Sequence, residues 1–199
     1  MTFDVIVAGV GGQGVLSVAA VIASAAMGQG LEVKQSEVHG MAQRGGAVLA
    51  HLRLADHPIA SDLIPKGHAS LILSMEPLES LRYLTYLAPG GTVITSMTPV
   101  RNIGDYPPLE QVLARIHRLP HAVLVDGEHL AKHAGSLRSV NMVMVGAASP
   151  VLPLAPEVLE RFITSRFQGK GDEIVDLNLR AFRAGREATL APGTLQRAC

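Results

Sequence analysis

The sequence predicts an α/β protein with a Rossmann-like three-layer fold, a mostly parallel sheet and a helical C-terminal third. Short apolar runs alternate with helical patterns from the N-terminus to about residue 127, and this alternation is typical of βαβ units. Helical patterns dominate after that point. Because such helices need an apolar surface to cover, we expect them to pack on a face of the sheet or against a partner.

The expected elements follow from the position of each apolar run. Strands are expected at residues 3–8, 31–37, 47–54, 69–75, 92–96 and 122–125, where the runs are short and bounded by turn residues. Helices are expected at residues 16–27, 76–87, 109–117, 128–134, 140–148, 156–166 and 172–188. We expect a single domain over residues 1–190 and a loose tail at residues 191–199.

The composition excludes several classes of function. The formal net charge is zero and no basic run occurs, so we do not expect nucleic-acid binding. Only 17% of the residues are charged, which indicates that a partner covers part of the surface. No apolar stretch reaches the 18 residues of a membrane helix, and Asp4 stands where a secretory signal needs a basic flank. We therefore expect a cytoplasmic protein without a membrane partner.

Cysteine usage limits the redox chemistry of the chain. The only cysteine is Cys199, so neither a disulfide within the chain nor an iron–sulfur cluster or cysteine-rich zinc site can form from its own thiols. Any such cluster has to sit on another subunit. His129 and His133 lie four residues apart on a predicted helix, but no third metal ligand is evident, and we assign no metal.

The first glycine-rich stretch, GVGGQG, follows the first predicted strand and opens the first predicted helix. Its glycines permit a tight turn in which backbone N–H groups approach an anion at the positive end of that helix. The alternative is a turn that only packs the helix close to the sheet. The candidate anion-binding residues are Gly9, Gly11, Gly12, Gln13 and Gly14.

The second stretch, SEVHGMAQRGG, carries hydroxyl, imidazole, amide and guanidinium donors beside a glycine pair. Its candidate residues are Ser36, His39, Gln43, Arg44 and Gly45. Arg44 suits a phosphate or carboxylate because its planar fork donates two parallel bonds. The stretch follows the second predicted strand, which places it at the same sheet edge as the first. The alternatives are a polar surface loop, or an NAD site with Glu37 on the ribose.

Other polar residues have weaker assignments. Asp126 ends a predicted strand, where it could contact a ligand or serve as the N-cap of the next helix, while Asn141 is either a cap or a buried hydrogen-bonding contact. No catalytic constellation is visible, neither a Ser–His–Asp set nor a P-loop lysine. We therefore assign no catalytic residue and expect this chain to be part of a larger enzyme.

The two stretches, followed by EPLESLRYLTYLAPGGTVI and NMVMVGA, resemble the gamma subunits or domains of 2-oxoacid:acceptor oxidoreductases. Within that family they are most similar to the beta subunits of indolepyruvate ferredoxin oxidoreductases. The resemblance covers roughly residues 3–188. It implies a large partner subunit that binds thiamine diphosphate and iron–sulfur clusters, decarboxylates an arylpyruvate and passes electrons to ferredoxin. Coenzyme A then accepts the acyl group.

The resemblance also implies roles for the candidate residues. This chain would hold no cofactor alone but would help to bind coenzyme A. Gly11, Gly12 and Gln13 would donate to a phosphate, with Ser36 and Arg44 as the next contacts. His39, Gln43 and Gly45 would line the loop that faces the partner. The isolated chain would be inactive and could form a homodimer. Two alternatives remain, a stand-alone NAD(P)-binding oxidoreductase and a non-enzymatic interaction module.

Overall fold

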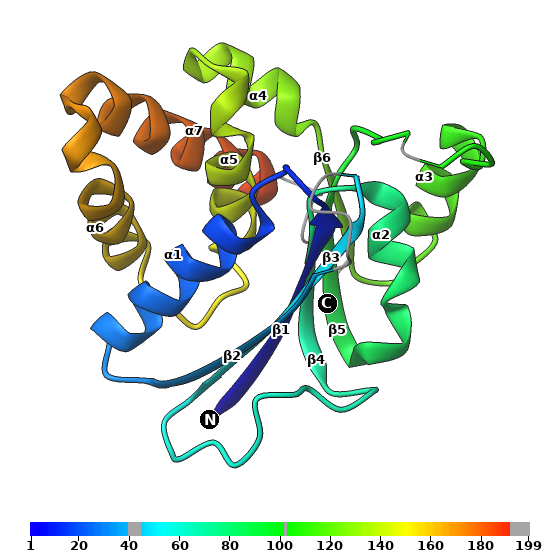
Figure 1. Ribbon diagram of the computed structural model, residues 1–199, viewed down its shortest axis with the longest axis horizontal. Coiled ribbons are helices and arrows are strands. Elements are labelled where there is room, and N and C mark those ends of the chain that lie inside the picture. The colour runs from blue at the N-terminus through cyan, green and yellow to red at the C-terminus, as the bar shows by residue number, and fades with distance from the viewer. Residues whose placement is uncertain (40–44, 102, 192–199) are drawn as a thin grey trace.

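The computed structural model describes residues 1–39, 45–101 and 103–191, and a six-stranded sheet with helices on both faces forms its centre (Figure 1). The strands lie in the order β2-β3-β1-β4-β5-β6. Their bounds are β1 Thr2–Val10, β2 Glu32–His39, β3 Ala47–Ala55, β4 Ala69–Ser74, β5 Leu87–Ser96 and β6 Ala122–Val125. Residues 192–199 of the expected tail lie outside the described residues.

Among the described strands, β3 alone runs against the others. β1, β4, β5 and β6 pair in parallel, whereas β3 pairs antiparallel with both β1 and β2. The predicted, mostly parallel sheet is therefore confirmed. β3 reverses because only a short connection joins it to β2, and a parallel crossover needs about a dozen residues or more. The carboxyl ends of the five codirectional strands therefore meet at one edge of the sheet, together with the start of β3.

Helices cover both faces of the sheet, which confirms the predicted three-layer arrangement. Their bounds are α1 Val15–Gly28, α2 Pro77–Arg82, α3 Leu109–His117, α4 Gly127–Ala134, α5 Val140–Ala148, α6 Pro156–Phe167 and α7 Asp172–Leu190. Helices α2 and α3 lie on one side of the sheet, and the other five lie on the opposite side (Figure 1). The larger core is on that second side, where small side chains such as Ala19 and Ala26 let α1 approach closely. No helix in the described part of the chain has both the length and the apolar character to cross a membrane.

Helices α5 and α7 contact each other backbone to backbone. A Cβ placed on Gly146 of α5 would lie 1.9 Å from the Phe182 carbonyl oxygen, and one on Gly185 of α7 would lie 1.9 Å from the Val143 carbonyl oxygen. Helix α5 is buried on nearly all sides, from Met142 onward. The helical third thus forms a stack in which α7 covers α5, rather than a single layer on the sheet.

The segment after β4 differs from the single helix expected at residues 76–87. Helix α2 ends at Arg82, a 3₁₀ turn follows at Leu84–Tyr86, and β5 begins directly after it. The glycine pair inside β5 explains this early start. Gly90 has a φ of +78°, and a Cβ on Gly91 would lie 2.8 Å from the Ala69 carbonyl oxygen of β4. The two strands shift register there, so APGG is an irregular part of the strand and not a turn before it.

Two side chains of β3 fasten the connection between β3 and β4, residues 56–68, to the sheet. Arg53 forms a two-point ion pair with Asp4, at 2.9 and 3.0 Å, and also donates to two carbonyl oxygens of the connection. His51 is buried, and its Nδ1 accepts a hydrogen bond from the Ile64 N–H at 3.1 Å. That bond needs an unprotonated Nδ1, and burial lowers the pKa of His51 below its usual value.

Candidate functional site

The first glycine-rich stretch forms the loop between β1 and α1, at the edge where the parallel strands end. Gly12 and Gly14 have φ values of +103° and +79°, a left-handed conformation that glycine adopts without the penalty of a side chain. Gly14 is also the N-cap of α1. Within the described residues, no hydrogen bond uses the N–H groups of Gly12, Gly14, Val15 and Leu16. Four donors at the positive end of a helix form a cradle for an anion.

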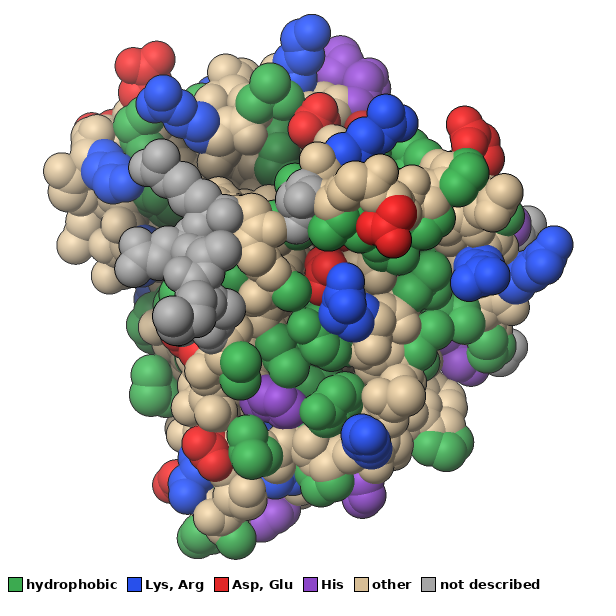
Figure 2. Space-filling model, turned by 45° about the vertical axis from the view of Figure 1, so that its right-hand side comes forward, with side chains coloured by type: hydrophobic (Ala, Val, Ile, Leu, Met, Phe, Trp, Pro, Cys, Tyr) green, Lys and Arg blue, Asp and Glu red, His purple; other side chains and the backbone are tan. Residues whose placement is uncertain are grey.

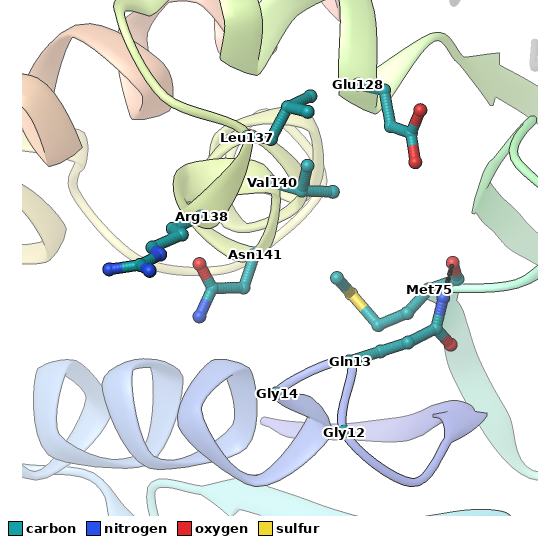
Figure 3. A pocket seen from close by; sticks show the side chains of 9 residues that line it. All are labelled: Gly12, Gln13, Gly14, Met75, Glu128, Leu137, Arg138, Val140 and Asn141. Atoms are coloured by element: carbon teal, nitrogen blue, oxygen red, sulfur yellow. Dashed lines mark hydrogen bonds between the residues drawn. The ribbon is translucent and has the colours of Figure 1, made fainter. Parts of the chain in front are cut away.

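Gly9 and Gly14 are also required by close packing. A Cβ on Gly9 would lie 2.8 Å from Val15 Cγ2 and 3.0 Å from Met75 Cβ. A Cβ on Gly14 would lie 3.1 Å from Nδ2 of Asn141, which reaches from α5 toward the loop (Figure 3). Gly9 therefore sets the distance between β1 and α1, whereas Gly14 makes room for a polar side chain from the helical third.

Gln13 has a different position from the one that the sequence suggested. Its Oε1 accepts a hydrogen bond from the Val10 N–H at 2.8 Å, and its Nε2 donates to the Met75 carbonyl at 3.0 Å (Figure 3). The side chain therefore ties the loop to the ends of β1 and β4. One Nε2 hydrogen remains for another acceptor.

The structure brings the end of the second stretch against the first. The Gly11 N–H donates to the Gly46 carbonyl at 2.8 Å, and the Gly45 N–H donates to the Gly11 carbonyl at 3.4 Å. Both backbone polar groups of Gly11 are therefore used within the chain, which leaves Gly12 and Gly14 as the donors of the loop. His39 is the last residue of β2. The candidates Gln43 and Arg44 lie outside the described residues.

Ser36 does not lie at this edge. β2 continues through His39, so Ser36 is three residues, roughly 10 Å, from the end of the strand. It pairs with His51, whose ring contacts Tyr86 on the face opposite α1. The sequence predicted that this strand ends at residue 37, with the polar stretch as the loop after it, but pairing with β3 continues the strand to His39. Ser36 is therefore removed from the group of residues around the cradle.

Glu37 does not have the setting of a ribose-binding acid. It accepts a hydrogen bond from the Gln35 Nε2 and lies within β2 rather than after it. In dinucleotide-binding folds the second strand is the parallel neighbour of the first, whereas β3 separates β2 from β1 here. This arrangement disfavours the alternative of a stand-alone NAD(P)-binding enzyme.

Three hollows that are lined by described residues lie around the N-terminus of α1. One of about 330 Å³ lies over the glycine loop, where side chains of α4, α5 and the turn before α5 face it (Figure 3). Its apolar lining comes from Met75, Leu137 and Val140, and Glu128 of α4 and Asn141 of α5 add polar groups to the lining. A second of about 280 Å³ lies on the other side of the loop, beside Leu16 and Val48. The third, of about 450 Å³, is lined by Ser17, Arg138, Asn141, Arg166, Phe167 and Lys170.

Sequence analysis missed Arg138, Arg166 and Lys170. They come from three separate elements of the helical third, namely the 3₁₀ turn Leu137–Ser139, helix α6 and the 3₁₀ turn Gln168–Lys170. Each is a single basic residue among other polar residues in the sequence. Neither a spacing nor a motif therefore identifies it as part of a binding site. The packing of both α5 and α6 against α1 brings them beside Ser17.

The structure places two of the weaker candidates on helix α4. Asp126 is the N-cap of α4, one of its two expected roles, because its side chain accepts a hydrogen bond from the His129 N–H at 3.1 Å. The rings of His129 and His133 lie 4.4 Å apart on α4. The part of the chain that the structure describes contains no group of three or more His, Cys, Asp and Glu side chains suited to a metal.

This fold and site define the class of protein. Residues 4–188 match the pyruvate ferredoxin/flavodoxin oxidoreductase family. Because the match spans nearly the whole chain, the chain belongs to this family. The resemblance read from the two glycine-rich stretches is thereby confirmed.

The chain is similar to named subunits within that family. The indolepyruvate oxidoreductase subunit IorB of Methanothermobacter thermautotrophicus is 39% identical, over 93% of this chain and 96% of that one. The same subunit of Pyrococcus horikoshii is 36% identical, over 94% of this chain and 95% of that one. The ketoisovalerate oxidoreductase subunit VorA of Methanothermobacter thermautotrophicus is 28% identical over 91% of this chain, which corresponds to 35% of VorA.

Solved structures share the fold. The 2-oxoglutarate:ferredoxin oxidoreductase from Magnetococcus marinus, with 2-oxoglutarate, coenzyme A and succinyl-CoA bound, superimposes with a TM-score of 0.76 at 24% identity. The match covers 94% of this chain but 31% of that longer one. The gamma subunit of keto/oxoacid ferredoxin oxidoreductase from Geobacter sulfurreducens matches with a TM-score of 0.72 at 23% identity, over 96% of this chain and 98% of that one.

Proposed function

We propose that this chain is the small subunit of a thiamine-diphosphate-dependent 2-oxoacid:ferredoxin oxidoreductase that acts on indolepyruvate and related arylpyruvates. The reaction is oxidative decarboxylation to an acyl-CoA and CO₂, with electrons passed to ferredoxin. The names of the relatives support the substrate class. We place the complex in the cytoplasm.

The role proposed for this chain is to bind coenzyme A and to help assemble the complex. The observation that carries this role is the cradle of unused N–H groups at Gly12, Gly14, Val15 and Leu16. A diphosphate fits such a cradle because the donors and the helix dipole both favour negative charge. Asn141 faces the same space and adds an amide donor. Coenzyme A bound in the structural relative supports this choice of ligand.

The rest of the hollow suits the remainder of coenzyme A. Its pantetheine arm has apolar segments between amide groups, and Met75, Leu137 and Val140 provide an apolar wall beside the cradle. Gln13 fixes the loop to the ends of β1 and β4, so the donors keep their direction before a ligand arrives. The chain thus orients the coenzyme, whose thiol receives the acyl group.

The bond-making chemistry belongs to the large subunit in this proposal. Thiamine diphosphate supplies the decarboxylation chemistry there, and iron–sulfur clusters carry the electrons. The sequence has one cysteine, so the cluster ligands have to come from elsewhere. In VorA a segment similar to this whole chain is about a third of a longer oxidoreductase subunit, which supports a function exerted together with other subunits or domains.

The test is co-expression with the large subunit, followed by CoA-dependent reduction of a ferredoxin surrogate with a panel of 2-oxoacids. We expect the two chains to copurify and the activity to need both, with arylpyruvates preferred over pyruvate and 2-oxoglutarate. Full activity of the large subunit without this chain would refute the proposal. Calorimetry of the isolated chain with NAD(P) tests the alternative of a stand-alone enzyme, which requires binding of NAD(P) without a partner. If neither coenzyme A nor another nucleotide binds to the complex through this chain, the alternative of a non-enzymatic interaction module is favoured.

A further inference from the structure

The hollow of about 450 Å³ beside α1 is lined by three cations without an acidic side chain. Arg138, Arg166 and Lys170 face it together with Ser17, Asn141 and Phe167. The chain as a whole has 17 basic and 17 acidic residues, so a lining whose charged residues are all basic is a local departure from a balanced composition. On the face shown in Figure 2, by contrast, Lys and Arg side chains lie dispersed among acidic and hydrophobic ones.

The positive charges in this hollow are not compensated within the described residues. The ion pairs among the described residues involve other cations, and none includes Arg138, Arg166 or Lys170. The contacts recorded for two of them are with neutral groups. Arg166 donates to the Ser17 hydroxyl at 3.3 Å, and the Lys170 Nζ lies 5.6 Å from the centre of the Phe167 ring. Cations gathered in one hollow repel each other unless an anion joins them, so the arrangement favours a phosphate group.

The hollow continues the cradle at the glycine loop. Ser17 follows Gly14 by three residues, which is about 4.5 Å along the helix axis. Arg138 and Asn141 line both this hollow and the one over the loop. A ligand with one phosphate group at the cradle and another roughly one helical turn away can therefore contact both.

We propose that Arg138, Arg166 and Lys170 form the subsite for the ribose 3′-phosphate of coenzyme A. This inference rests on the proposed function, because it assumes that the diphosphate lies at the glycine loop. Coenzyme A carries its 3′-phosphate on the same ribose that bears the diphosphate, and dephospho-coenzyme A differs from it only in that group. This small subunit, rather than the catalytic one, therefore distinguishes the two molecules.

The test uses the assembled complex and measures KM for coenzyme A and for dephospho-coenzyme A at a saturating 2-oxoacid concentration. In Arg166→Ala and Lys170→Ala we expect the KM for coenzyme A to rise about tenfold or more. The KM for dephospho-coenzyme A stays within about twofold of the wild type, so the preference for coenzyme A collapses. Arg161→Ala is the matched control, since Arg161 lies on the same helix and stacks on Phe162 instead of facing the hollow.

Two results would overturn this assignment. One is an equal rise in KM for both ligands, which would place the cluster on a phosphate that they share. The other is no change beyond that in Arg161→Ala. Gly14→Ala tests the proposed function separately, because it alters the cradle for the diphosphate and so raises both KM values. If that variant affects both ligands and the basic variants affect neither, the coenzyme site stands and the 3′-phosphate subsite falls.

Discussion

The substitution Gly14→Ala tests the link between the conformation of the loop and coenzyme binding. Gly14 has a φ of +79°, and an added Cβ would lie 3.1 Å from Asn141 Nδ2. The alanine therefore either holds a left-handed conformation and displaces the Asn141 amide, or rotates the backbone and turns the N–H groups of the cradle. Both responses change the donors that face the ligand.

The expected magnitudes follow from these two effects. A left-handed alanine costs roughly 1–2 kcal/mol, and for a chain of this size that lowers Tm by about 2–8 °C. Loss of one hydrogen bond to a charged phosphate costs about 1.5–3 kcal/mol, which corresponds to a roughly 10- to 150-fold weaker affinity. The fold should therefore survive, while the KM for coenzyme A in the complex rises by at least about tenfold.

Gly30→Ala provides the control within the same helix–loop region. Gly30 follows the other end of α1, has a φ of +81°, and has no atom within 4 Å of an added Cβ. It should lose about the same stability as Gly14→Ala by thermal unfolding, yet leave the KM for coenzyme A unchanged. Equal KM values for the two variants would show that the cradle does not bind the coenzyme and would refute the reasoning.

Three further predictions concern the packing, the pH response and the loop anchor. Gly146→Ala and Gly185→Ala should each lower the free energy of unfolding by about 1–3 kcal/mol or more in denaturant titrations, while Gly169→Ala, with open space around it, changes it little. The pKa of His51 is lowered in the folded state, so stability should fall as pH drops below about 6.5, because only the unfolded chain then takes up the proton. His51→Asn, whose Oδ1 can replace Nδ1, should flatten that fall, and an unchanged pH profile would contradict it. Gln13→Ala should raise the KM for coenzyme A while the protein still unfolds cooperatively, and Gln13→Glu should not restore the KM, because a carboxylate cannot donate to the Met75 carbonyl.

Much of the fold can be predicted from the sequence, because the local pattern of apolar residues agrees with the elements that the packed structure contains. Helix α3 and strand β6 have the predicted bounds, since each apolar period ends at clear turn residues. The sequence context placed the glycine loop between a strand and a helix, which is the position that anion binding by such a loop requires. The sequence also predicted that the two glycine-rich stretches lie close together, because β1 and β2 run in the same direction and end at the same edge of the sheet.

The roles of single polar residues were less predictable, since they depend on contacts distant in sequence. Gln13 has the composition of a ligand donor, yet its partner is the Met75 carbonyl, 62 residues away. Ser36 lies in a polar run, but pairing with β3 keeps that run in the sheet. Arg138, Arg166 and Lys170 face one hollow because α5 and α6 both pack against α1.

The helical third has a larger role than covering the sheet. Asn141 at the start of α5 and Arg166 at the end of α6 form one wall of the candidate site, while the glycine loop forms the other. The close contact between α5 and α7 fixes the first of these helices, and a two-point ion pair between Arg183 of α7 and Glu160 of α6, at 2.8 and 2.7 Å, ties in the second. Because α7 holds both helices, we expect a change at Gly146 or Gly185 to weaken coenzyme binding as well as stability, although neither glycine is among the described residues that line the three hollows.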